Sequence, residues 1–148
     1  MIKIRIANIS DSDDILLWRN DELSRSMFIN NDVITKAEHL NWYIKAIKDK
    51  NIFIYIGEKD HIKLGVVRMN LLNDNNTFQV SINLNPKMRG KGLSADLLRL
   101  ALSKIPNHNK CVFIAKIKNK NEISKRTFKK CGFIYQYSKK NLDCYILK

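Results

Sequence analysis

Alternation of apolar and polar residues marks several short stretches of the chain, and each stretch predicts a strand with one buried face. Ile2, Ile4 and Ile6 alternate with basic residues at the start of the chain. From Phe78 to Leu84 the even positions are apolar and the odd positions are polar. Further β-rich runs predict strands at 52–56, 64–72, 111–117, 133–137 and 144–147.

Helical spacing replaces this alternation between the strands. Thr35 and Glu38 form a capping box before an apolar face that runs through 40–47. An apolar stripe from Leu97 to Ile105 predicts a buried helix, which Pro106 ends. Other helices are expected within 12–27 and 121–131. The resulting order, β-α-α-α-β-β-β-α-β-α-β-β, predicts an α/β fold in which a mixed sheet carries helices on both faces.

Length and composition are those of a single globular domain that spans residues 1–148. No apolar run approaches the ~20 residues that a membrane-spanning helix needs. Cys111, Cys131 and Cys144 are odd in number and lack the spacing of a metal site. We therefore expect reduced thiols, a cytoplasmic protein and no bound metal.

The charge balance is strongly basic, with a formal net charge of +13 at pH 7. Such a balance favours polyanionic ligands, which include nucleic acid, an anionic membrane and small molecules rich in phosphate. It does not choose among them, and a solvated basic face or a biased genome composition would give the same excess of lysine.

A basic glycine loop, Asn85 to Ser94, connects the strand that ends at Leu84 to the helix that follows. A helix N-terminus leaves backbone N–H groups unpaired, so a glycine loop that leads into one is suited to binding an anion. The loop lacks the Gly-Lys-Ser/Thr ending of a Walker P-loop. It also lacks the third glycine of a dinucleotide-binding fingerprint.

Residues Arg89 to Ser94 resemble the Gln/Arg-x-x-Gly-x-Gly/Ala pyrophosphate loop of the GCN5-related N-acetyltransferases, the GNAT family. Ser94 departs from the usual Gly or Ala. A second block with matching spacing resembles the family's pattern of Asn, a small residue, an aromatic residue and Lys before Gly-Phe. Its residues here are Asn121, Ser124, Phe128, Lys130, Gly132 and Phe133.

A third resemblance concerns the acceptor side. The segments 18–21 and 35–40 are similar to a GNAT branch that contains ribosomal-protein acetyltransferases and the nucleotide-amino-sugar acetyltransferases of nonulosonic acid synthesis. The expected substrate-binding residues are Trp18, Arg19, Asn20 and Arg68. Arg19 or Arg68 would hold a diphosphate or a carboxylate, although a surface salt bridge fits them equally, and Trp18 also fits a core position.

The family resemblance implies acetyl-CoA as the cofactor, bound where the strand before the glycine loop separates from the strand after its helix. The loop amides would hold the pyrophosphate, and Asn121 would bond the pantetheine arm. An N–H group near Leu84 would polarise the thioester carbonyl. The expected cofactor-binding residues are Leu84, Arg89, Gly90, Lys91, Gly92, Leu93, Ser94, Asn121 and Phe128.

The catalytic residues are less determined. Phe128 stands where the family often has a tyrosine that protonates the departing thiolate, and it has no proton to give. Ser124, one helical turn away on the same face, is a candidate acid, and protonation by water is the alternative. Glu38 and His39 are candidate bases, although Glu38 also fits a capping role and His39 an exposed polar position.

The sequence thus favours an acetyl-CoA-dependent N-acetyltransferase that acts on a nucleotide-linked amino sugar of the UDP-4-amino-4,6-dideoxy type. The alternative within the family is a ribosomal-protein N-terminal acetyltransferase. Alternatives of another class are a basic RNA- or ribosome-binding module and a non-catalytic acetyl-CoA-binding protein. The expected partner is a small-molecule amine, with a homodimer as an open possibility and with no membrane or nucleic acid.

Overall fold

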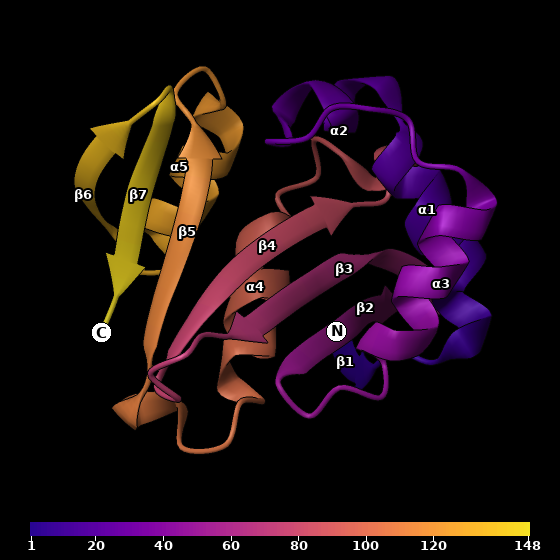
Figure 1. Ribbon diagram of the computed structural model, residues 1–148, viewed down its shortest axis with the longest axis horizontal. Coiled ribbons are helices and arrows are strands. Elements are labelled where there is room, and N and C mark those ends of the chain that lie inside the picture. Colours follow the sequence, from indigo (N-terminus) through magenta and orange to yellow (C-terminus); the bar gives the residue numbers. More distant parts are fainter.

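Seven strands form one sheet, in the order β1-β2-β3-β4-β5-β7-β6, in the computed structural model, which describes residues 1–148 (Figure 1). Every neighbouring pair is antiparallel except β4 and β5, which are parallel. The strands are β1 (Lys3–Ile6), β2 (Ile52–Lys59), β3 (Ile62–Leu71), β4 (Thr77–Leu84), β5 (Val112–Lys118), β6 (Ile134–Lys139) and β7 (Leu142–Leu147).

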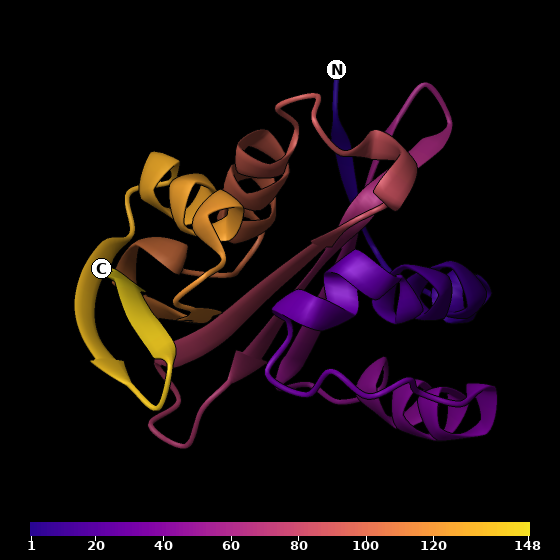
Figure 2. The same ribbon diagram turned by 90° about the horizontal axis from the view of Figure 1, so that it is seen from above.

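Helices cover both faces of this sheet, so the predicted mixed α/β architecture is confirmed. Helices α1, α2 and α3 lie on one face and α4 and α5 on the other (Figure 2). They are α1 (Ser12–Asn20), α2 (Glu22–Met27), α3 (Lys36–Ala46), α4 (Ser94–Ser103) and α5 (Glu122–Lys130), with short 3₁₀ turns at Ile9–Asp11, Pro86–Met88 and His108–Lys110. None of the helices is long and apolar enough to cross a membrane.

Each face of the sheet has its own core. The larger core packs α4 and α5 against β2 to β5 and β7, and its buried side chains include Leu97, Leu98 and Phe113. Helix α4 lies close to β2 at Gly57, where a Cβ atom would be only 2.2 Å from Leu97 Cδ1. Glycine makes this approach possible because it has no Cβ atom. The smaller core packs α1 and α3 against β2 and β3 through Trp18 and its neighbours.

The first strand departs from its expected burial. Ile4 packs against the larger core, but Ile6 is 71% exposed because β1 is the edge strand. Asn8 caps the 3₁₀ turn that follows this strand. The Asn8 side chain accepts a hydrogen bond from Ser10 N at 2.9 Å, and the Asp11 carboxylate accepts one from Asn8 N at 2.9 Å.

Asp11 is fully buried and joins the edge strand to the rest of the domain. Its carboxylate accepts two hydrogen bonds at 2.7 Å from Arg5 on β1 and pairs with Lys63 on β3 at 2.8 Å. Burial alone would raise the pKa of Asp11, but the hydrogen bonds from Arg5 and Lys63 outweigh it and hold the pKa well below its usual range. The charge is therefore compensated where it is buried.

The parallel pairing of β4 and β5 is short. It covers only Thr77–Gln79 against Val112–Ile114, after which the two strands diverge (Figure 1). Each strand keeps its other neighbour to the end: β4 pairs with β3 as far as Leu84, and β5 pairs with β7 as far as Lys118. The divergence leaves facing strand edges unpaired in the middle of the sheet.

Replacing Asp11 by asparagine tests the buried charge network. Asp11→Asn should lower the free energy of unfolding by about 3 kcal/mol, because Arg5 and Lys63 lose their shared counter-charge. The measurement is urea unfolding at pH 7. Asp13→Asn is the control, because Asp13 is exposed, and it should cost at most about 1 kcal/mol. Equal losses in the two variants would contradict the role given to Asp11.

Candidate active site

A cavity of about 490 Å³ occupies the space where β4 and β5 diverge. Its walls come from the second half of β4, from β5, from α5, from the loop before α4, and from α2 with the residue that follows it. The cavity therefore reaches from the α4–α5 side of the sheet to the α1–α3 side. This volume lies in the range of small-molecule sites.

The glycine loop forms one end of the cavity. Gly90 and Gly92 both line it and have positive φ angles, of 74° and 72°. A Cβ atom at either position would meet nothing within 4 Å, so the backbone conformation, and not lack of space, requires glycine here. The N–H groups of residues 90 to 96 donate to no acceptor within the protein. These free amides precede and begin α4, where they are suited to bind an anion.

Basic side chains surround the same end. Arg126 and Lys130 of α5 line the cavity one helical turn apart. Lys116 of β5 also lines it, but Lys116 alternates with Ala115 and Ile117 of the larger core and so lies on the other face of the sheet. None of these three residues was among the expected site residues. Their spacing of four residues on a helix that follows the Asn121 block is the sequence feature that could have identified the two on α5. Arg126, Lys130 and the free amides together fit a ligand that carries several phosphates, as acetyl-CoA does.

Arg89 does not extend its side chain toward this anion site. Its guanidinium pairs with Asp21 and donates a hydrogen bond to the Ser24 hydroxyl at 2.7 Å. The Ser24 hydroxyl in turn donates to Asn83 Oδ1 on β4 at 3.1 Å. Hydrogen bonding from Arg89 lowers the pKa of Asp21. Arg89 thus connects the glycine loop to α2, which was not expected from the sequence.

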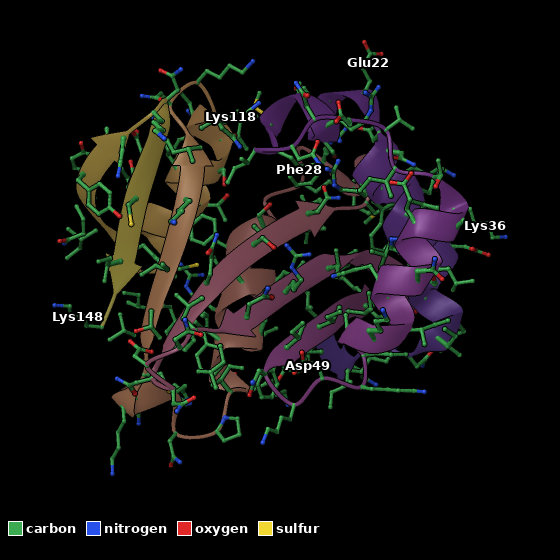
Figure 3. The ribbon with its side chains drawn as sticks, viewed as in Figure 1. Glu22, Phe28, Lys36, Asp49, Lys118 and Lys148 are labelled. Atoms are coloured by element: carbon green, nitrogen blue, oxygen red, sulfur yellow. The ribbon has the colours of Figure 1, made fainter.

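A second contact holds α2 from the other strand. Lys118, at the end of β5, donates to the carbonyl oxygen of Ser26 at 3.1 Å. Lys118 and Phe28 both lie near α2, between the far ends of β5 and β4 (Figure 3). Helix α2 is therefore attached to both diverging strands, and its residues Leu23 and Met27 line the cavity between them.

Ser124, the candidate acid, lines the cavity. Its backbone N–H donates to the Asn121 side chain at 3.1 Å, and its hydroxyl makes no hydrogen bond within the protein. Asn121 thus caps α5 and also lines the cavity. Phe128 lines the cavity too but belongs to the larger core, where it packs edge-to-face on Phe133 with ring centroids 4.9 Å apart. A free hydroxyl and an inert ring therefore lie on one face of α5.

The two candidate bases are not at the cavity. His39 is buried in contrast to the exposed position considered for it, and its ring stacks on Tyr43 at 5.5 Å on the α1–α3 side. Burial lowers the pKa of His39. Glu38 is exposed at the start of α3, where its N–H donates to the Thr35 hydroxyl at 3.2 Å. Neither residue is among those that line the cavity.

The expected substrate residues lie on the α1–α3 side of the sheet. Trp18 is buried in the smaller core. Asn20 bonds the backbone of Ile34 in both directions, at 2.8 and 2.9 Å, and so fixes the segment between α2 and α3. Arg19 and Arg68 are partly exposed and lie outside the cavity lining. Of the expected cofactor residues, Lys91 and Leu93 do not line the cavity, whereas these do: Leu84, Arg89, Gly90, Gly92, Ser94, Asn121 and Phe128.

The diverging strands, the glycine loop and the Asn121 cap occur together over most of the chain, and a family model described as Acetyltransferase (GNAT) domain matches residues 2–134. The chain belongs to the GNAT family of acetyltransferases. This GNAT protein is accordingly an N-acetyltransferase that takes its acetyl group from acetyl-CoA. Comparison with curated protein sequences gives no match.

Solved structures share the fold at low sequence identity. Spermidine N-acetyltransferase from Vibrio cholerae, in complex with CoA and spermine, has a TM-score of 0.85 at 17% identity and covers 98% of this chain and 92% of its own. The yncA protein of Salmonella typhimurium, with its cofactor acetyl-CoA, gives 0.82 at 21% identity, with 100% and 94% covered. Aminoglycoside acetyltransferase AAC(6')-Ib with coenzyme A gives 0.81 at 15% identity, with 99% and 94% covered.

The left-handed glycines make the loop testable without removing a side-chain contact. Gly92→Ala should weaken CoA binding about tenfold, because alanine disfavours positive φ and displaces the free amides; the strain should also cost about 1 kcal/mol of stability. CoA affinity is measured by titration calorimetry. Gly132→Ala is the control, since Gly132 also has positive φ, at 92°, but lies outside the cavity. It should lose stability and keep its CoA affinity; equal loss of affinity in both would contradict the assignment.

Proposed function

We propose that this acetyltransferase acetylates the amine of a nucleotide-linked amino sugar, of the UDP-4-amino-4,6-dideoxy type used in nonulosonic and pseudaminic acid synthesis. The cavity carries the proposal, because it has an anion-binding loop at one end and opens beneath α2 and Phe28 at the other. Two ligands can therefore meet within it from opposite faces of the sheet. The similarity of segments 18–21 and 35–40 to the nucleotide-amino-sugar branch supports this acceptor.

The donor half of the site uses main-chain groups. Acetyl-CoA supplies an activated thioester, and the free N–H groups of residues 90 to 96 bind its pyrophosphate. The unpaired edge of β4 up to Leu84 offers backbone groups to the pantetheine arm, and an N–H near Leu84 polarises the thioester carbonyl. Asn121, at the rim of α5, is placed to bond the same arm.

Acetyl transfer requires two proton movements. The amine nitrogen forms a bond to the acetyl carbon while the C–S bond breaks; one proton leaves the nitrogen and one reaches the sulfur. Ser124 is the proton donor that the cavity offers on α5, since Phe128 has none. Glu38 and His39 lie away from the cavity, so water accepts the proton from the amine. A sugar amine is weakly basic, and its lone pair is available near pH 7.

The deciding experiment measures release of free CoA thiol from acetyl-CoA with a UDP-4-amino-4,6-dideoxy sugar, and in parallel with a ribosomal N-terminal peptide. We expect turnover with the sugar and none with the peptide. Turnover with the peptide alone would replace the proposed acceptor by a protein N-terminus. CoA binding without thiol release from either acceptor would reject both.

Removing the hydroxyl of Ser124 tests the proton donor. Ser124→Ala should lower kcat about 10- to 100-fold, near the lower end of general acid catalysis because CoA is a fair leaving group, with little change in the KM for acetyl-CoA. Initial rates of thiol release give both constants. Ser103→Ala, on the exposed side of α4, and Glu38→Gln should keep the parental kcat. A Ser124→Ala enzyme with unchanged kcat would assign the proton to water instead.

A further inference from the structure

Two arginines on the α1–α3 side of the sheet lack acidic partners. The guanidinium of Arg68, in the middle of β3, makes no hydrogen bond and no ion pair within the chain. Arg19, at the end of α1, donates from Nη2 to the carbonyl oxygen of Asn30 at 2.5 Å, while its Nη1 is buried and unpaired. Guanidinium groups remain charged at any physiological pH, so these charges are uncompensated within the chain. Both side chains are partly exposed, so a bound anion could reach them and supply the missing counter-charge.

Aromatic rings fix both guanidinium groups in place. The Arg68 Cζ atom lies 5.3 Å from the centre of the Trp42 ring, and the Arg19 Cζ atom lies 4.4 Å from the centre of the Phe28 ring. A cation–π contact of this kind uses the charge of the guanidinium and does not consume its N–H donors. The Arg68 guanidinium is thus positioned by a contact that uses none of its hydrogen-bond donors, and Arg19 commits only Nη2, to the Asn30 carbonyl oxygen.

The charges around the pair are mostly of the same sign. Burial lowers the pKa of Arg68, and the nearby charge of Arg19 lowers it further. Burial likewise lowers the pKa of Arg19, with a further contribution from Arg25 on α2. Asp32 is the carboxylate that acts on Arg19, but it is exposed and forms no ion pair with it. The cluster of Arg19, Arg25 and Arg68 is therefore a region of net positive potential.

This cluster borders the cavity. Arg68 is the register partner of Ser81 on β4, and adjacent strands lie about 4.8 Å apart. Ser81 and Phe28 both line the cavity, and the Arg19 guanidinium lies over the Phe28 ring. Both arginines therefore lie one residue away from the cavity lining, on the face of the sheet opposite α4 and α5.

We propose that Arg19 and Arg68 bind an oxyanion of the acceptor, so that the amines acetylated by this protein carry a phosphate, diphosphate or carboxylate group. This inference rests on the proposed function and extends it from one acceptor to a chemical class. It also excludes polyamines, because a cationic acceptor would be repelled by the cluster. The spermidine N-acetyltransferase of Vibrio cholerae shares the fold but would then differ in the charge of its acceptor.

A binding experiment tests the arginine site independently of turnover. The protein is saturated with CoA, which occupies the glycine loop, and inorganic pyrophosphate is then titrated by calorimetry. We expect one site, with affinity reduced about 10- to 100-fold in Arg68→Gln and less in Arg68→Lys, which retains the charge but not the fork of donors. Arg99→Gln, at an exposed arginine of α4, is the matched control and should bind as the parent does. Equal binding by Arg68→Gln and the parent would overturn the proposal.

Kinetics with matched amine pairs identify the source of the oxyanion. The pairs are the UDP-linked amino sugar against the same amino sugar without its nucleotide, and an amino acid against its methyl ester. In the pair whose anion the arginines bind, Arg68→Gln should raise the KM for the anionic amine about 10- to 100-fold and leave the KM for the neutral amine unchanged. The kcat should be largely unaffected for both amines. A difference in the sugar pair identifies the bound group as the diphosphate, and a difference in the amino-acid pair identifies it as the carboxylate. Faster turnover of spermidine than of any anionic amine would overturn the proposal.

The two proposals fail in different ways. No thiol release with the UDP-linked sugar, together with pyrophosphate binding that depends on Arg68, rejects the acceptor named above and retains the anionic class. Turnover of that sugar with equal KM in the parent and Arg68→Gln retains the function and rejects the arginine site. Thermal unfolding of Arg68→Gln, compared with Arg99→Gln, shows whether the substitution has disturbed the fold.

Discussion

The early parting of β4 and β5 is the constraint on which the rest of the structure depends. The two strands share three residue pairs and then follow their other neighbours, β3 and β7, to the end. The sheet thereby behaves as two halves that are joined at one end and open at the other. The elements that form the site surround this opening: the glycine loop, α4 and α5 lie on one face of the sheet. On the other face α2 bridges the two strands, through the contact of Arg89 with Asp21 and that of Lys118 with Ser26. Unpaired strand edges in the middle of a sheet are tolerated here because they line a cavity that a ligand can fill.

Much of this architecture could be predicted from the sequence, because the features concerned are local. Alternation of apolar and polar residues predicted strands, helical spacing predicted helices, and the glycine loop before α4 predicted an anion site. Both loop glycines have the left-handed conformation that such a loop requires, and Gly132 ends α5 in the same way. The order of elements then left a mixed sheet with two helical layers, which is the fold that the structure has.

What could not be predicted depends on contacts between distant parts of the chain. Arg89 lies in the loop that resembles a phosphate-binding motif, yet its side chain pairs with Asp21, which is 68 residues earlier in the chain. His39 was considered as an exposed polar residue, but the packing of α3 on α1 buries it beside Tyr43. Asp11 carries no signal in the sequence that separates it from its acidic neighbours, and it forms the buried centre of a network with Arg5 and Lys63. In each case tertiary packing provides a partner that the sequence does not identify.

The two ends of the cavity present different kinds of chemical group. The donor end consists largely of main-chain amides in a loop whose form depends on two glycines, whereas the opposite end is lined by side chains such as Leu23, Met27 and Phe28. Main-chain amides are common to all residues, so sequence drift leaves the donor end almost untouched while it remodels the other. Substitutions at the side-chain end can therefore change which acceptor fits, while the main-chain end continues to bind the same donor.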